Sequence, residues 1–211
     1  MVFSWRNPFL YQCMINFYIS VICLYQWGVH LESTHLIEVN EIQTLTKGHV
    51  LYFFKNQDQY VKNVVDFVIS GLELSEYSVI VENDRFIPLI KKRLKLLVDE
   101  SRLKKVAFVN NYDFYFATGD FRINSIFDYL PNLIEGDLKN DLAIRSWAHV
   151  EWRDEREVSR KLMDSENEAD KIVAETKLLS VCAYDSERIS KEFKEGLLNC
   201  HNFLINEAGK S

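Results

Sequence analysis

Short apolar runs alternate along the chain with longer segments in which apolar residues recur at helical spacing. Residues 49–54 form the first run, and similar β-rich runs lie within residues 74–83 and 104–111. Two further extended segments, residues 142–152 and 178–185, follow in the second half of the chain. Continuous apolar runs of this length are typical of strands that are buried on both faces of a parallel sheet.

The segments between these runs have the periodicity of amphipathic helices. They predict helices after the first three runs, a helix or helix pair over the charged residues 153–177, and a last helix. Strands that alternate with such helices indicate an α/β fold, in which a mostly parallel sheet lies between two layers of helices. Residues 112–116 are expected to form an aromatic loop, and residues 30–47 a polar connector with a weak helical pattern. The helical pattern is carried by Tyr60, Val64, Phe67, Val68, Gly71 and Leu72; by Phe86, Ile90, Leu94 and Leu97; by Ile126, Leu130, Leu133 and Ile134; and by Ile189, Phe193 and Leu197.

The segment after the first run lacks the glycine-rich loop that nucleotide-hydrolysing enzymes of this layout need. Residues 55–60 read Lys-Asn-Gln-Asp-Gln-Tyr, and no glycine occurs between Phe54 and Gly71. A phosphate-binding loop uses glycines so that backbone N–H groups can approach the oxygens, and a Lys for the terminal phosphates. The sequence therefore predicts a nucleotide-binding layout without its catalytic loop, which favours sensing or binding.

Length and composition fit one domain with an additional segment. The 211 residues can form a substantial core, and Pro and Gly are too scarce for long disordered linkers. The net charge is −6, from 25 basic and 31 acidic residues, and no basic stripe interleaved with aromatic residues occurs, which argues against direct nucleic-acid binding. The four cysteines have no framework spacing and fit a reduced, cytoplasmic setting, with a Cys182–Cys200 disulfide as the alternative.

The N-terminal segment is apolar and has several interpretations. Residues 7–29 carry no formal charge, so residues 8–29 are a candidate for membrane contact or a membrane tether, with the N-terminus in the cytoplasm. A helix buried on the domain or on a partner, and an extension from an early start codon, are the alternatives. We divide the chain into an apolar helical appendage with its connector (residues 1–46), an α/β domain (residues 47–206) and a tail (residues 207–211).

In a parallel sheet, ligands bind in the crevice beyond the carboxyl ends of the strands. Trp152, Tyr115 and Tyr184 could line an apolar pocket in that crevice, with core packing as the alternative. By position, the crevice would draw on residues 54–55, 83–84, 110–115, 152–153 and 184–185.

Arg145 is a charged residue within an otherwise apolar run, where an unpaired charge would be costly. It requires an anionic ligand, a carbonyl, or a structural ion pair with a residue such as Glu175 or Asp185. Asp185 ends its run in the manner of a magnesium-binding Asp of phosphate-loop enzymes, but the Lys and Ser/Thr partners of such a site are missing. Metal-dependent hydrolysis is therefore not expected.

His49, Cys182, Cys200 and His201 have metal-ligand chemistry, but their spacing fits no standard zinc pattern. Free cysteines are commonly buried apolar residues, so we predict neither a metal site nor a cofactor. Cys182, a histidine and Asp185 would form a nucleophile group only if the fold brought them together, and a cysteine in mid-strand is usually inert. No catalytic residue is predicted.

Motifs distributed over the α/β domain form an ordered set. They are Gly48-His49 with Leu51-Tyr52; Phe67 with Gly71-Leu72; residues 115–121; Ile144-Arg145 with Glu151-Trp152; Glu175; Cys182, Tyr184 and Asp185; and His201. In order and spacing this set resembles the MEDS family, the methanogen/methylotroph DcmR-type sensory domain, from Lys47 to Asn206. The resemblance implies a RecA/KaiC-like α/β fold without a phosphate loop, in a family thought to sense small organic ligands and found joined to histidine kinases or DNA-binding modules.

The resemblance implies a non-enzymatic sensory or regulatory domain of prokaryotic signal transduction. Such a domain would bind a small organic ligand and signal through a histidine kinase or transcription regulator, with a homodimer as a candidate assembly. A degenerate nucleotide-binding or hydrolysing protein and a ligand-independent interaction module are the alternatives. The expected ligand-binding residues are His49, Tyr52, Tyr115, Arg145, Glu151, Trp152, Cys182, Tyr184 and Asp185.

Overall fold

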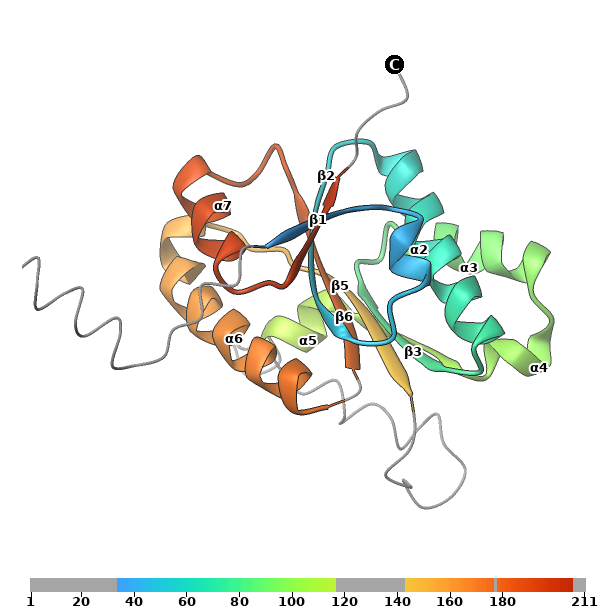
Figure 1. The fold of residues 1–211 in the computed structure, drawn as a ribbon. Coiled ribbons are helices and arrows are strands. Elements are labelled where there is room, and N and C mark those ends of the chain that lie inside the picture. Colours follow the sequence, from blue (N-terminus) through green and yellow to red (C-terminus); the bar gives the residue numbers. More distant parts are fainter. Residues whose placement is uncertain (1–33, 117–142, 177, 207–211) are drawn as a thin grey trace, which may run out of the picture. The chain divides into compact units, whose positions relative to one another are not determined.

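A seven-stranded sheet forms the centre of the domain (Figure 1). The computed structural model describes residues 34–116, 143–176 and 178–206, and the strand order is β1-β7-β2-β6-β5-β3-β4. Every pair of neighbouring strands is parallel, which confirms the predicted α/β class. The strands are β1 (His35–Glu38), β2 (Gly48–Phe54), β3 (Tyr77–Glu82), β4 (Val106–Asn110), β5 (Ile144–His149), β6 (Leu178–Asp185) and β7 (Phe203–Asn206).

Helices cover both faces of this sheet. Figure 1 shows α2, α3 and α4 on one side, and α5, α6 and α7 on the other. The helices are η1 (Glu41–Gln43), α2 (Gln57–Glu73), α3 (Ile87–Leu97), α4 (Glu100–Leu103), α5 (Asn111–Phe116), α6 (Glu155–Glu175) and α7 (Lys191–Leu198).

Alternation along the strands divides the core into two parts. In β2, Val50, Tyr52 and Phe54 pack with α2 and α3, whereas Leu51 packs with the residues of α5, α6 and α7. Because successive side chains of a strand point to opposite faces, His49 shares the face of Leu51. The same strand therefore places aromatic residues under α2 and a histidine under α6.

The connection between β2 and α2 consists of only Lys55 and Asn56. The side-chain Oδ1 of Asn56 accepts a hydrogen bond from the backbone N–H of Gln59 at 2.9 Å, so this carboxamide caps the helix. A phosphate loop at this position would instead require several residues whose N–H groups are open to a ligand. The geometry agrees with the predicted loss of the phosphate cradle.

Two local predictions were wrong, and one strand was not predicted. Residues 35–38, within the predicted connector, form the edge strand β1, and residues 203–206 form β7 beside it. Both strands have only four residues, too few for a clear alternating pattern. Residues 112–116 lie in the helix α5 rather than in a loop. The helix predicted around residues 126–134 lies outside the described residues.

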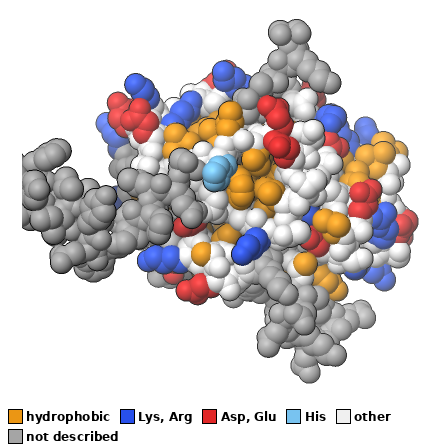
Figure 2. Space-filling model, viewed as in Figure 1, with side chains coloured by type: hydrophobic (Ala, Val, Ile, Leu, Met, Phe, Trp, Pro, Cys, Tyr) orange, Lys and Arg blue, Asp and Glu red, His pale blue; other side chains and the backbone are white. Residues whose placement is uncertain are grey.

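The outer edge of the sheet is partly apolar. Leu36 of β1 is 63% exposed, and hydrophobic side chains gather over β1 and β7 on the face seen in Figure 2. Within the described ranges, no helix has the length and apolar character needed to span a membrane. The predicted apolar segment, residues 8–29, lies outside those ranges.

Candidate functional site

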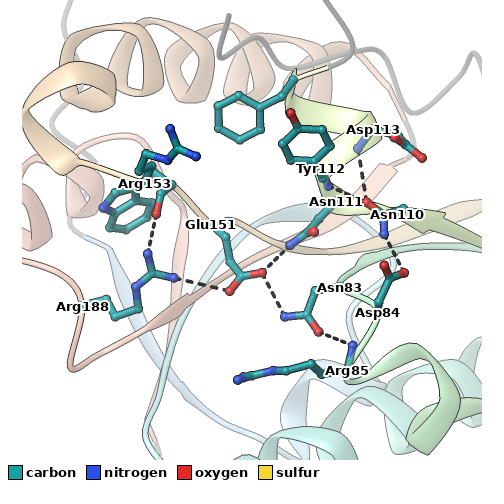
Figure 3. Close-up of a pocket in the computed structure, with 12 residues that line it drawn as sticks. Asn83, Asp84, Arg85, Asn110, Asn111, Tyr112, Asp113, Glu151, Arg153 and Arg188 are labelled. Atoms are coloured by element: carbon teal, nitrogen blue, oxygen red, sulfur yellow. Dashed lines mark hydrogen bonds and ion pairs between the residues drawn. The ribbon is translucent and has the colours of Figure 1, made fainter. Parts of the chain in front are cut away.

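A crevice of about 990 Å³ opens beyond the carboxyl ends of β3, β4 and β5 (Figure 3). This is the end of a parallel sheet at which ligands bind in open α/β folds. Its surface combines amide, charged and aromatic side chains. The lining consists of Asn83, Asp84 and Arg85 after β3, Asn110 to Asp113 and Phe116 around β4 and α5, Glu151 to Arg153 after β5, and Arg188 after β6.

Glu151 has polar contacts with three side chains of the crevice. Its Oε2 accepts hydrogen bonds from Nδ2 of Asn83 at 2.9 Å and from Nδ2 of Asn111 at 2.7 Å, while its Oε1 lies 3.4 Å from Nη1 of Arg188. Burial alone would raise the pKa of Glu151, but the charge of His149 and these hydrogen bonds outweigh it and hold the pKa below its ordinary value. Glu151 therefore carries a fixed negative charge.

Asparagine side chains fix the backbone of the crevice walls. Oδ1 of Asn83 accepts from the N–H groups of Arg85 and Phe86, both at 3.1 Å. Oδ1 of Asn110 accepts from the N–H of Tyr112 at 2.8 Å, and its Nδ2 donates to Asp84 at 2.7 Å. These bonds satisfy the backbone at the strand ends, so the crevice is shaped before any ligand enters.

A buried polar chain leads away from the crevice beneath Glu151. Nε2 of His149 lies 3.9 Å from Oε1 of Glu151, and its Nδ1 lies 2.6 Å from Oε1 of Glu82. Oε2 of Glu82 accepts from the hydroxyl of Tyr60 on α2 at 2.5 Å. Burial, followed by the charge of Glu82, raises the pKa of Tyr60. The chain thus connects the crevice floor to the helix on one face of the sheet.

The prediction missed Glu82, His149 and Arg188. Glu82 is the only acid at the end of the apolar run of β3, and it is fully buried. A charge at the carboxyl end of a buried strand is the signal that could have identified it. Arg188 has no such signal, because it follows β6 in an irregular turn.

Of the nine predicted ligand-binding residues, Glu151 and Trp152 line the crevice. Arg188 donates to the backbone oxygen of Trp152 and lies over its ring, 5.9 Å from the centroid. Asp185 is at the start of a turn, where its Oδ1 accepts from the N–H of Glu187 at 3.0 Å. It acts there as a turn residue.

The predicted tyrosines pack in the core. Tyr52 lies under α2 and accepts a hydrogen bond from Nδ2 of Asn63 at 2.8 Å. Tyr115 and Tyr184 belong to the apolar cluster on the opposite face and are at most 2% exposed. The structure therefore places Tyr115 and Tyr184 where core packing, the alternative interpretation for these two residues, would place them.

Arg145 is fully buried below α2, at the amino-terminal end of β5, away from the crevice. Its Nε donates to Oε2 of Glu76 at 2.5 Å, and its Nη1 bonds the backbone oxygen of Phe67 and the hydroxyl of Ser70. The expected structural ion pair is present, but its partner is Glu76. The prediction of Asp185 is wrong because this residue lies at the carboxyl end of β6, whereas Arg145 lies at the amino-terminal end of β5. The prediction of Glu175 is wrong because this residue ends α6, on the other face of the sheet.

Four buried polar side chains meet on the α6 face of the sheet. Nε2 of His49 lies 3.4 Å from Sγ of Cys182 and 3.3 Å from Oε2 of Glu166, and Nε2 of His201 lies 3.6 Å from the same oxygen. One ligand-type atom from each of these residues lies within 4.8 Å of all the others. We call His49, Glu166, Cys182 and His201 the buried cluster. Cys200 is outside it, with Sγ directed at Asn167.

The two histidines of the buried cluster have pKa values that are shifted in opposite directions. Burial, and then the charge of His49, lower the pKa of His201 to about 3. Burial alone would also lower the pKa of His49, but Cys182 and the carboxylates of Asp170 and Glu166 outweigh burial and raise it. Burial raises the pKa of the Cys182 thiol to about 11, so this cysteine has no nucleophilic thiolate at neutral pH. Asp185 is not part of the cluster, and the imagined Cys-His-Asp group is not formed.

Glu166 was not predicted, although its position gives a signal. It follows Leu162 by four residues and precedes Val173 by seven, so it occupies the core-facing stripe of α6. An acid in that stripe must have buried partners.

One family model matches most of the domain: the model described as MEDS, MEthanogen/methylotroph, DcmR Sensory domain, matches residues 48–202. No curated protein and no solved structure matches the chain. The matched range contains the crevice and the buried cluster.

Proposed function

Because the chain belongs to the MEDS family of sensory domains, we propose that it binds a small organic ligand in the strand-end crevice and signals through a protein partner. The observation that carries this proposal is the coordination of Glu151. A charged carboxylate held by two asparagines and an arginine, in a crevice of about 990 Å³, provides a specific polar anchor for a ligand.

The lining suggests the chemistry of the ligand. Arg85, Arg153 and Arg188 can donate hydrogen bonds, whereas Asp84 and Glu151 can accept them. Trp152, Tyr112 and Phe116 add apolar surface. A small molecule with hydroxyl, amine or carboxylate groups and a short apolar part matches this combination.

We propose that the domain is non-enzymatic. The capped two-residue connection after β2 leaves no cradle for a triphosphate, and the Cys182 thiol is buried and protonated. These features support binding without turnover on a RecA/KaiC-like scaffold over residues 47–206.

Signalling requires that the ligand binds two conformations with different affinity. A ligand that hydrogen-bonds Glu151 would compete with Arg188 and alter the charge next to His149. The chain from His149 through Glu82 to Tyr60 then provides a route to α2. A histidine kinase or transcription regulator that contacts this face is the proposed output.

Thermal-shift measurements on the full chain test the proposal. The probes are short-chain alcohols, diols, amines and carboxylates, together with ATP and Mg²⁺. We expect one organic class to raise Tm by about 5–10 °C at a hundredfold excess over Kd. Glu151→Gln should abolish the shift, and Glu168→Gln, an exposed acid on α6, should preserve it.

The rival functions give different results. A Tm rise that requires ATP with Mg²⁺ would favour a nucleotide-binding protein. If no probe changes Tm and the Glu151→Gln variant still binds a protein partner, the results would favour a ligand-independent interaction module.

A further inference from the structure

The buried cluster brings together residues from four separate elements. His49 comes from β2, Glu166 from α6, Cys182 from β6, and His201 from the turn between α7 and β7. All four are at most 6% exposed. None of them lines the crevice of the proposed sensory function.

Backbone carbonyls fix the orientation of both histidines. Nδ1 of His49 lies 2.8 Å from the backbone oxygen of Cys200, and Nδ1 of His201 lies 2.7 Å from that of Leu197. A carbonyl oxygen only accepts, so each Nδ1 carries the proton that it donates. Nε2 of His201 is then a lone pair, because the lowered pKa keeps this ring neutral. His49, whose pKa is raised, carries a second proton on Nε2, which must leave before that atom can bind a metal. Both Nε2 atoms point into the cluster, beside Oε2 of Glu166. This arrangement is the usual outer support of a metal-binding histidine.

The carboxylate of Glu166 is oriented in the same way. The hydroxyl of Tyr184 donates to its Oε1, which leaves Oε2 facing the two histidines. Oε2 of Glu166 and Nε2 of His201 are buried, and neither has a hydrogen-bond partner among the described residues. Two acceptor atoms that face each other without a proton between them are costly in a protein interior.

We propose that His49, Glu166, Cys182 and His201 form a closed, four-ligand site for a Zn²⁺-type cation. Ligands that lie 2.0–2.3 Å from a tetrahedral Zn²⁺ are separated from one another by roughly 3.3–3.6 Å. The three atom pairs given above are separated by 3.3, 3.4 and 3.6 Å. A cation at their centre satisfies both acceptor atoms that have no partner.

The donor set selects the metal. Two imidazoles, one carboxylate and one thiolate suit a borderline-soft ion, and Mg²⁺ or Ca²⁺ would require oxygen ligands. On binding, the bonds from Sγ of Cys182 and from Nε2 of His49 to their protons are replaced by bonds to the metal, and both protons pass to solvent. All four positions belong to the protein, so the ion is structural.

Coordination requires one adjustment. The rings of His49 and His201 are stacked, with centroids 3.9 Å apart and planes at 25°. Rotation of the rings would direct both Nε2 lone pairs to a common ion. The site therefore tightens when the ion binds during folding.

Metal analysis of the purified full chain tests the site. The protein is unfolded with chelator, refolded with Zn²⁺ or Co²⁺, and measured by elemental analysis and visible absorption. We expect about one ion per chain, and for Co²⁺ the intense bands of a tetrahedral centre with thiolate-to-cobalt charge transfer. Cys182→Ser should remove the charge-transfer band and lower affinity by at least about 10–100-fold.

Matched controls separate loss of ligands from loss of folding. Cys200→Ser and Glu168→Gln change a neighbouring cysteine and a neighbouring acid outside the cluster and should retain the full metal content. Glu166→Gln keeps the shape of the side chain and should weaken binding, with circular dichroism confirming the fold. Refolded wild type that takes up neither ion, or uptake that is unchanged in Cys182→Ser, would overturn the proposal, and neither result affects the crevice.

Discussion

A Cβ atom on Gly71 would lie 2.5 Å from Cδ of Arg145, so the arginine can cross beneath α2 only because residue 71 has no side chain. The carboxylate of Glu76, five residues after Gly71, accepts a hydrogen bond from Nε of Arg145. The absent side chain and the buried ion pair are therefore two parts of one arrangement.

Gly71→Ala should destabilise the domain although it replaces glycine within a helix. Alanine gains about 1 kcal/mol in helix propensity, but overlap with a buried, hydrogen-bonded side chain costs about 1–3 kcal/mol. We expect a net loss of about 1 kcal/mol in the free energy of unfolding, measured by urea denaturation. Gly196→Ala is the control, because its Cβ would meet only the flexible end of Met163 at 3.2 Å. If Gly71→Ala and Gly196→Ala stabilised the domain equally, Arg145 would not pack closely against residue 71 as described.

Arg145→Met should cost about 3–5 kcal/mol of unfolding free energy, since it leaves the carboxylate of Glu76 buried without its partner. The double variant Arg145→Met with Glu76→Leu should recover much of this loss, because no isolated charge remains. A double-mutant cycle by urea denaturation measures the coupling. Strictly additive effects would show that the pair does not interact as described. The response to crevice ligands should be unchanged in a folded double variant.

Glu151 should contribute to the loss of stability in acid. Its pKa in the folded protein is below the ordinary value of 4.5, so its contribution is present above that value and is lost as pH falls through the lower, folded pKa. The unfolding free energies of wild type and Glu151→Gln should therefore differ most near neutral pH and converge in acid. Urea denaturation at about pH 7 and about pH 3 checks this. A difference that grows in acid would have the wrong sign.

Tyr184→Phe should weaken the buried cluster without disturbing the crevice. The variant keeps the ring but removes the hydroxyl that donates to Oε1 of Glu166. Loss of such an outer partner typically lowers metal affinity by about 10–100-fold. Competition with a chromogenic chelator measures the change, and Tyr112→Phe, which changes an exposed side chain of α5, is the control. Equal affinities in the two variants would mean that Tyr184 does not position Glu166.

The sequence predicted those strands and helices whose hydrophobic pattern extends over many consecutive residues. Continuous apolar runs predicted β2 and β6 within one residue, because strands buried on both faces leave no polar gaps. The helical stripe of α2 was equally clear. The four-residue strands β1, at the edge of the sheet, and β7, between β1 and β2, were missed, and β1 exposes three of its four residues.

The candidate sites were predicted only where they depend on strand ends. The asparagines of the crevice follow apolar runs, and their proximity follows from a parallel sheet. Glu151 was expected only through the family resemblance. The buried cluster depends instead on pairing between segments that are far apart in the chain: Leu51 pairs with Cys182, which places His49 near β6. Zinc patterns with short spacings cannot detect such a set.

The position of β2 has a consequence for synthesis on the ribosome. Both of its neighbours, β6 and β7, come from the last third of the chain, with Val50 opposite Phe203 and Leu51 opposite Cys182. An emerging polypeptide therefore holds its most apolar strand unpaired on both edges until translation is nearly finished. A premature stop before residue 203 would leave one of those edges permanently open, a known template for aggregation.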